Sequence, residues 1–112
     1  MFESNLTKII NTLSKKSRKR LRKDYKEWIK EKGCLVSGMS GVDPHHIRNL
    51  NGLTGMSITP PDEFCIPLSR FYHSELHSPE VNSNFEIKYN INLINELKRL
   101  NNEFVETMKN YE

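Results

Sequence analysis

The sequence lacks any apolar run near the roughly 20 residues that a membrane-spanning helix needs. It has only two cysteines, Cys34 and Cys65, which are too few for a disulfide framework. Its first residues show no basic segment followed by an apolar stretch, so we expect no secretory signal. These absences predict a soluble cytoplasmic protein that has no membrane partner.

Apolar residues are also scarce. Only 36% of the 112 residues are hydrophobic, and there is a single Trp. A chain of this length holds one small domain, and so thin a core is marginal. We therefore expect a metal ion, a partner chain or packed terminal helices to support it, and an oligomer is compatible with the sequence.

Positive charge is concentrated in one segment. Residues 15–32 carry ten Lys or Arg against three Asp or Glu, a net charge of +7, whereas the rest of the chain is −4. Such a block indicates a polyanionic partner, most simply DNA, and the alternative is a solvated helix face that keeps the protein in solution. The predicted DNA-binding residues of this block are Lys15, Lys16, Arg18, Lys19, Arg20, Arg22, Lys23 and Lys26.

The chain divides into three parts within one domain. Residues 1–33 form a basic N-terminal arm, in which apolar spacing predicts helix over 7–32 with a break near Ser14. Residues 34–90 are the middle part, in which 34–79 are rich in Gly and Pro and predict short strands and loops, with a short helix over 70–78. Residues 91–112 belong to a C-terminal helix that packs on the core, and Asn90 or Asn92 would cap it.

All four histidines lie in the middle part. His45 and His46 are adjacent, and His73 and His77 have the i, i+4 spacing that places two imidazoles on one helix face. This spacing suits two ligands of one metal ion, with a third from the doublet and the fourth His left for acid–base chemistry. The alternatives are a surface pair on the helix and a chance doublet.

Several spaced motifs together resemble the HNH endonucleases, which have the ββα-metal or His-Me finger fold. The motifs are Asp-Pro-His-His-Ile-Arg at 43–48, a Gly-rich stretch, Pro61-Asp62, Ile-Pro-Leu-Ser-Arg at 66–70 and the His-x3-His pair. They are most similar to small phage-type HNH proteins such as the recombination enhancement function nucleases, and they cover about residues 34–90. The resemblance implies an α+β fold with a ββα-metal core, flanked by the basic helical segment and the C-terminal helix, and metal-dependent hydrolysis of DNA.

The resemblance also implies roles for individual residues. His45, His73 and His77 would hold one divalent ion, which would be Zn, Mg, Mn or Ni. His46 would be the general base that deprotonates a water molecule. Arg48 would act beside it at the scissile phosphate.

The sequence departs from the family pattern at two points. The positions of a structural zinc site read Cys34, Ser37, Ser69 and Tyr72, so we expect no structural zinc and a hairpin held by packing and hydrogen bonds. The central Asn of the family has no clear counterpart, and Asp62 is the nearest polar residue that would brace the loop.

Two alternatives to an active nuclease stay open. An HNH-fold protein that cuts poorly or not at all would still bind DNA through the basic block and Arg70. A metal-stabilised protein-interaction module would need neither DNA nor a general base.

Overall fold

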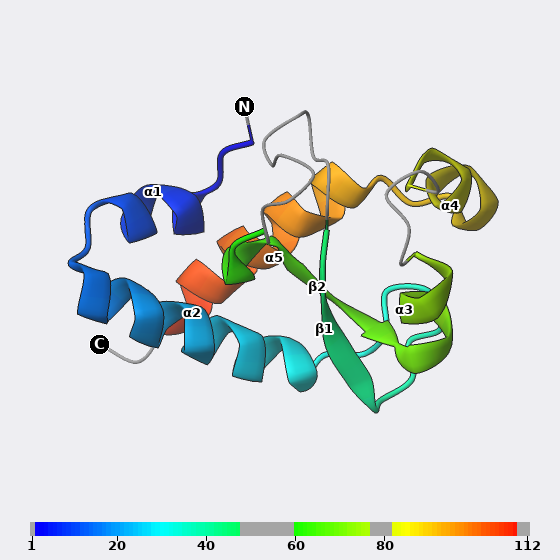
Figure 1. The fold of residues 1–112 in the computed structure, drawn as a ribbon, viewed down its shortest axis with the longest axis horizontal. Helices are drawn as coiled ribbons and strands as arrows, with labels where there is room; N and C mark the ends of the chain where they lie inside the picture. The colour runs from blue at the N-terminus through cyan, green and yellow to red at the C-terminus, as the bar shows by residue number, and fades with distance from the viewer. Residues whose placement is uncertain (1, 48–59, 77–81, 110–112) are drawn as a thin grey trace.

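A two-stranded antiparallel sheet lies at the centre of the fold, with helices at both ends of the molecule (Figure 1). The protein is represented by a computed structural model that describes residues 2–47, 60–76 and 82–109. This described part is α+β, with five α-helices and one 3-10 turn around the sheet.

Two helices separated by a sharp break form the N-terminal arm. Helix α1 spans Asn5–Asn11 and begins with a capping box in which Ser4 and Thr7 exchange hydrogen bonds. Helix α2 spans Lys15–Lys30, and the Ser14 side chain accepts a hydrogen bond from the backbone N–H of Ser17. The predicted break near Ser14 is therefore confirmed, because this serine caps a new helix.

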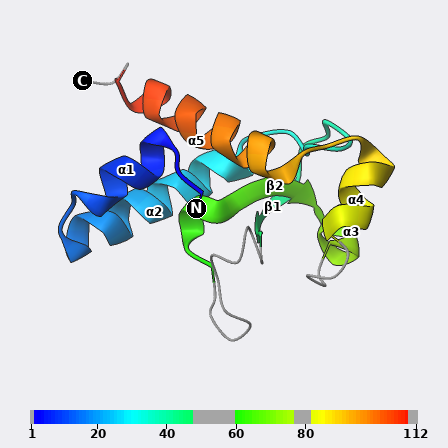
Figure 2. The ribbon, with the colours of Figure 1, turned by 90° about the horizontal axis from the view of Figure 1, so that it is seen from above.

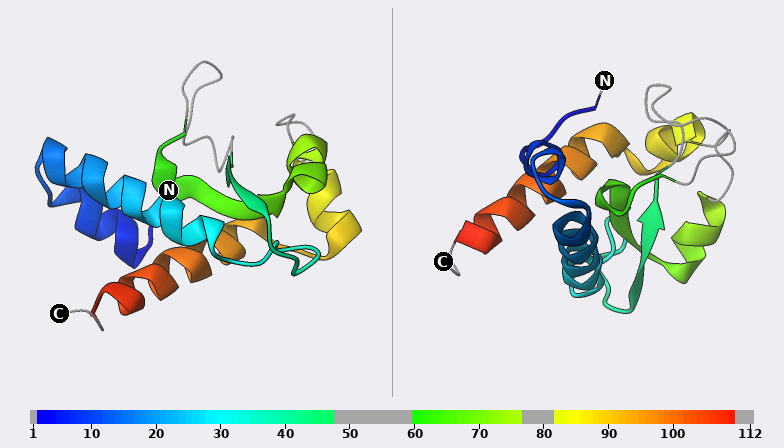
Figure 3. Two further views of the ribbon diagram at one scale, coloured as in Figure 1. Left: turned by 90° about the horizontal axis from the view of Figure 1, so that it is seen from below. Right: turned by 60° about the vertical axis from the view of Figure 1, so that its left-hand side comes forward.

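The sheet pairs strand β1 (Val42–His46) with strand β2 (Cys65–Ser69) in an unbroken antiparallel register from Val42↔Ser69 to His46↔Cys65. A 3-10 turn, η1 (Asp62–Phe64), leads directly into β2. Helix α2 packs against one side of this hairpin and α3 against the other (Figure 3, right). Short strands in the middle of the chain were predicted, and this prediction is confirmed.

Three helices follow the sheet. Helix α3 (Arg70–Glu75) continues from β2 without a loop and ends at its C-cap, Leu76, so it is shorter than the predicted helix over 70–78; residues 77 and 78 lie outside the described residues. Helix α5 (Leu93–Lys109) is capped by Asn92, whose side-chain oxygen accepts from the Asn95 N–H at 2.9 Å. Asn90 instead has a left-handed φ of 54° and ends helix α4.

Helix α4 (Asn82–Tyr89) was not predicted. Its apolar residues do not gather on one face, so it lacks the periodicity by which an amphipathic helix is recognised. Tertiary contacts stabilise it instead, because Phe85 is buried and Tyr89 packs edge-on against Tyr72 at 5.3 Å. Among the described helices, none combines the length and apolar character needed to cross a lipid bilayer.

The terminal helices supply a large part of the core. Helix α5 runs beside α1 and across β2 (Figure 2). Phe104 of α5 packs against Tyr25 and Trp28 of α2 at ring distances of 5.2 and 5.4 Å. The expectation that packed terminal helices support a thin core is therefore confirmed. Their buried apolar residues are Leu6, Ile10, Leu93, Leu97, Leu100, Phe104 and Val105.

A buried amide joins these helices to the sheet. Asn101 of α5 is fully buried; its Nδ2 donates to the Tyr25 hydroxyl and to the Glu63 carbonyl, both at 3.0 Å. Its Oδ1 accepts from the Ser4 hydroxyl at 2.8 Å, and Tyr25 in turn donates to the Cys65 carbonyl at 2.9 Å. Burial raises the pKa of Tyr25, so its hydroxyl stays a donor. One side chain thus connects α1, α2, η1 and α5.

We expect Asn101→Ala to lower the free energy of unfolding by about 3 kcal/mol, because buried hydrogen-bonding groups lose their partner. The matched control is Asn95→Ala, which changes an exposed residue of the same helix and should shift stability by less than about 0.5 kcal/mol. Urea unfolding followed by circular dichroism measures both. Equal effects of the two variants would contradict a special role for the buried amide.

The turn after α2 holds the base of the hairpin through a thiol. The Cys34 sulfur accepts from the Ser69 N–H at 3.4 Å, and the Leu35 N–H donates to the Pro67 carbonyl at 3.1 Å. Burial raises the pKa of Cys34, but hydrogen bonds from Ser37, Ser69 and the Val36 backbone outweigh it and lower the pKa to about 7. Three of the four positions predicted to have lost a structural zinc site, Cys34, Ser37 and Ser69, are therefore joined by hydrogen bonds at the Cys34 sulfur, and the absence of zinc stays a prediction.

The lowered pKa of Cys34 predicts a pH-dependent stability. Because the folded state favours the thiolate, its contribution is full above the unfolded pKa near 9 and is lost as the pH falls towards 7. Two pKa units correspond to at most about 2–3 kcal/mol. We expect the wild-type protein to gain up to that much more stability than Cys34→Ser between pH 6 and pH 9, measured by urea unfolding under reducing conditions. Parallel pH curves for the two proteins would refute this prediction.

Candidate functional site

Two of the predicted metal ligands lie together on the α3 side of the hairpin. The imidazole rings of His45 and His73 are 4.5 Å apart and almost perpendicular. His45 is only 6% exposed, and the Nδ1 atoms of both residues are buried. The third predicted ligand, His77, lies outside the described residues.

The local sequence explains this approach. Strand β2 leads straight into α3 at Ser69–Arg70, so α3 must stay beside the hairpin. His73 lies in the first turns of that helix, and His45 is the fourth residue of β1, opposite Ile66 of β2. The ββα order therefore places these two imidazoles at one junction.

His46 has a different environment from its neighbour. Its Nε2 lies 2.8 Å from Oδ1 of Asp62, and the other oxygen of Asp62 lies 3.5 Å from Nζ of Lys26 on α2. The side chains of His46 and Asp62 are 29% and 30% exposed, so water reaches both. Asp62 was predicted to brace the loop, which lies outside the described residues. Its described contacts are with His46 and Lys26.

The strand geometry separates the histidine doublet. Successive side chains of a strand point to opposite faces, and directly paired residues share a face. The register pairs His46 with Cys65 and His45 with Ile66, without a bulge in the described hairpin. His45 is therefore directed to the α3 side, whereas His46 joins Asp62 and Lys26 on the α2 side.

A thiol lies beside the His46–Asp62 pair. The sulfur of Cys65, a ring nitrogen of His46 and a carboxylate oxygen of Asp62 all lie within 4.8 Å of one another, a spacing at which three ligands can meet a cation. Burial, and then the charge of Asp62, raises the pKa of Cys65, so its sulfur stays protonated. With Lys26 already beside the carboxylate, the group suits a hydrogen-bonded His46–Asp62 pair better than a bound cation.

The basic block forms two stripes on α2. Lys15, Lys19, Arg22 and Lys26 are spaced by four, three and four residues and lead to Asp62. Together with Arg18 and Asp62, the first three line a hollow of about 600 Å³. A second stripe, about 100° around the helix, contains Lys16, Arg20 and Lys23.

Some of the predicted DNA-binding side chains already have partners. Arg22 makes a two-point ion pair with buried Glu63 at 2.8 and 3.1 Å. Arg18 donates to the backbone carbonyls of Leu13 and Asn11. Within the first stripe, Lys15 and Lys19 are therefore exposed, whereas Arg22 and Lys26 lie beside carboxylates.

The two other predicted arginines differ in what the structure shows. Arg70 is 91% exposed on α3, three residues before His73, and its Nε is 4.0 Å from Oδ2 of Asp43. It therefore extends from the same helix face as His73. Arg48 lies outside the described residues.

Comparison with known proteins places most of this chain in one family. The family model described as "Protein of unknown function (DUF968)" matches residues 11–105, which include α2, the hairpin, His45, His46 and His73. An Escherichia coli strain K12 protein, "Uncharacterized protein YdfU", is 39% identical over 74 residues, which are 66% of this chain. The chain spans about a fifth of that relative, with 20% of it covered. No solved structure matches. Because the family model covers well over half of the sequence, the chain belongs to the family described as "Protein of unknown function (DUF968)".

Proposed function

We propose that this protein is an HNH-type endonuclease that hydrolyses phosphodiester bonds of DNA with the help of one divalent metal ion. The observation that carries the proposal is the meeting of His45 from β1 with His73 from α3, at the junction of a β-hairpin and the helix that follows it. His45 is buried and His73 is partly buried with its Nδ1 enclosed, and two imidazoles in such contact are a donor pair suited to a transition metal. The sequence motif adds His77 to this pair.

The donor set favours some ions over others. Imidazole nitrogens suit zinc and nickel, whereas magnesium and manganese prefer oxygen ligands. His45, His73 and His77 would hold the ion. When bound, it would act as a Lewis acid that stabilises negative charge on the phosphate oxygens.

The contact with Asp62 prepares His46 to act as a base. A carboxylate only accepts hydrogen bonds, so neutral His46 must donate from Nε2, which leaves the lone pair of Nδ1 to take a proton from water. Asp62 then stabilises the imidazolium that forms, and Lys26 lies 3.5 Å from the other oxygen of this carboxylate. The difference in exposure supports this division of roles, because buried His45 suits a ligand and accessible His46 suits a base.

One observation favours the second candidate, a DNA-binding HNH-fold protein that does not cut. His45 and His46 are directed to opposite sides of β1. However, His46 is the last residue of that strand, and neighbouring Cα atoms are only about 3.8 Å apart. A phosphate that crosses the end of β1 would therefore reach both side chains, which is why we rank hydrolysis first.

We expect His46→Ala to reduce cleavage by about 10²–10⁴-fold, the usual contribution of a general base, while metal and DNA binding persist. His73→Ala should lose metal binding and cleavage together. Single-turnover nicking of supercoiled plasmid with a panel of metals, with and without EDTA, measures the rate. Calorimetric metal titration should give about one ion per chain for the wild type and for His46→Ala.

The role of Asp62 is tested beside a matched carboxyl variant. Asp62→Asn should slow cleavage by about 10–100-fold, as expected for a partner that orients a catalytic group. Asp43→Asn changes a half-exposed carboxyl on the same hairpin and should stay near the wild-type rate. If His46→Ala and the wild type nick plasmid equally, or if neither cuts with any metal, the nuclease proposal fails and the DNA-binding protein replaces it.

We expect the first stripe of α2 to supply affinity for DNA without reading its sequence. Lys15→Gln with Lys19→Gln should weaken binding to all duplexes and reduce the slope of log affinity against log salt by about 0.9 for each lost phosphate contact. Lys16→Gln with Arg20→Gln removes the same charge from the second stripe and should have the smaller effect. Fluorescence anisotropy over a salt series compares the two. If the two double variants reduced affinity and salt slope equally, α2 would be only a solvated basic face.

A further inference from the structure

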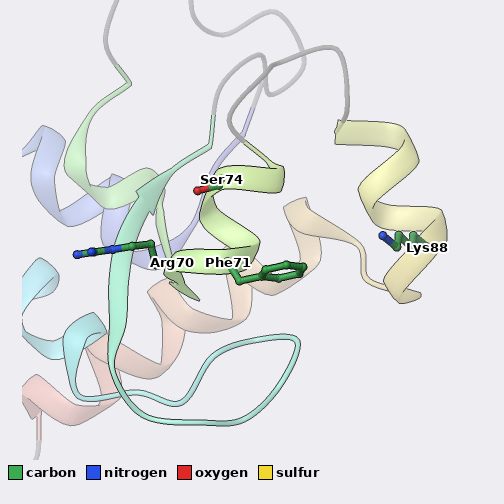
Figure 4. A pocket seen from close by; sticks show the side chains of 4 residues that line it. All are labelled: Arg70, Phe71, Ser74 and Lys88. Carbon is green, nitrogen blue, oxygen red and sulfur yellow. The ribbon is translucent and has the colours of Figure 1, made fainter.

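A pocket between α3 and α4 combines an exposed aromatic ring with two cations. It is lined by Arg70, Phe71, Ser74 and Lys88 and has a volume of about 500 Å³ (Figure 4). Phe71 is 70% exposed, although α3 is otherwise held against the hairpin. In Figure 4 its ring points towards α4, where Lys88 lies, while Arg70 extends the other way across β1.

The ring of Phe71 is held in place by other aromatic residues. It packs edge-on against Tyr72 at 5.0 Å, and Tyr72 packs edge-on against Tyr89 of α4 at 5.3 Å. Tyr89 in turn contacts buried Phe85 at 4.8 Å. Phe71 is therefore a positioned apolar surface whose accessible part borders the pocket.

We propose that Phe71 is a stacking platform for one unpaired nucleobase, and that Arg70 and Lys88 contact phosphates of the same strand. Flat aromatic surfaces flanked by Lys or Arg are the usual means by which proteins hold single-stranded nucleic acid. A planar and anionic occupant fits this lining best, because the ring is flanked by Arg70, which is 91% exposed and 4.0 Å from Asp43, and by Lys88, whose Nζ lies over the Tyr89 ring at 5.2 Å. The Ser74 hydroxyl adds a donor and acceptor at the same rim.

The position of the pocket relates it to the proposed metal centre, and this step rests on the proposed function. Arg70 and His73 are three residues apart and share one face of α3, whereas Phe71 faces α4. A strand whose phosphate lies at Arg70 would therefore have a neighbouring base at Phe71. In a duplex, both faces of that base are already stacked. The substrate class inferred is thus a strand that is unpaired next to the cleaved bond.

The test measures binding in EDTA, so that it does not depend on cleavage. A fluorescent 12-nucleotide single strand and the matching duplex are titrated with the wild type, Phe71→Ala and Phe71→Trp. Loss of one stacked base should weaken single-strand binding by about 5- to 100-fold in Phe71→Ala, and Trp should restore it. Duplex affinity should not change. A 2-aminopurine in the single strand should be quenched by the wild type and not by Phe71→Ala.

The matched control is Ile87→Ala, because Ile87 is an equally exposed large apolar residue, 80% accessible, on α4 outside the pocket lining. It should leave both affinities unchanged. Equal losses in Phe71→Ala and Ile87→Ala, or an equal loss for duplex and single strand, overturn the proposal. An unchanged single-strand affinity of Phe71→Ala also overturns the proposal. This outcome includes the case in which Phe71→Ala leaves that affinity unchanged but dissociates a dimer, as measured by sedimentation. Plasmid nicking by Phe71→Ala separates a failure of this proposal from a failure of the proposed nuclease function. If the variant still cuts plasmid but shows no defect in single-strand binding, only the stacking platform is ruled out.

Discussion

The buried amide of Asn101 is the constraint on which the rest of the structure depends. A polar side chain without access to water must satisfy its hydrogen bonds within the protein, and Asn101 does so with Ser4, Tyr25 and the Glu63 carbonyl. This fixes η1 against α5 and α2. Asp62 is the first residue of η1. The helices at the two ends of the chain therefore fix the position of its carboxylate beside His46.

The sequence predicted the elements whose signals are local. The break at Ser14 and the start of α5 after Asn92 follow from caps and periodicity, and the short strands of the middle part follow from its Gly and Pro residues. Helix α4 was missed because its apolar residues share no face, and its stability comes from contacts such as Tyr72–Tyr89. Tertiary contacts of this kind leave no periodic signal in the sequence.

The candidate site was predicted unevenly for the same reason. The spacing of the histidines left open which member of the doublet joins His73, and the resemblance to HNH endonucleases named His45, whose ring lies 4.5 Å from that of His73 in the structure. The pairing of His46 with Asp62 bridges 16 residues and depends on η1, which no local pattern predicts. The sequence held only a weak indication that Phe71 is exposed. Helical spacing places Phe71 on a different face of the helix from His73.

If the protein has the proposed function, the separation of His45 from His46 constrains the path of the substrate. The cations of α2 lead to Asp62 and His46 on one side of the hairpin, whereas His45, His73 and the Phe71 pocket lie on the other. A nucleic acid that contacts both sides must pass around the end of β1. Duplex DNA is stiff over about 150 base pairs, and bending it sharply within a few nucleotides is costly. An unpaired strand follows such a turn readily, so the shape of the hairpin and the exposed aromatic ring favour the same substrate for independent reasons.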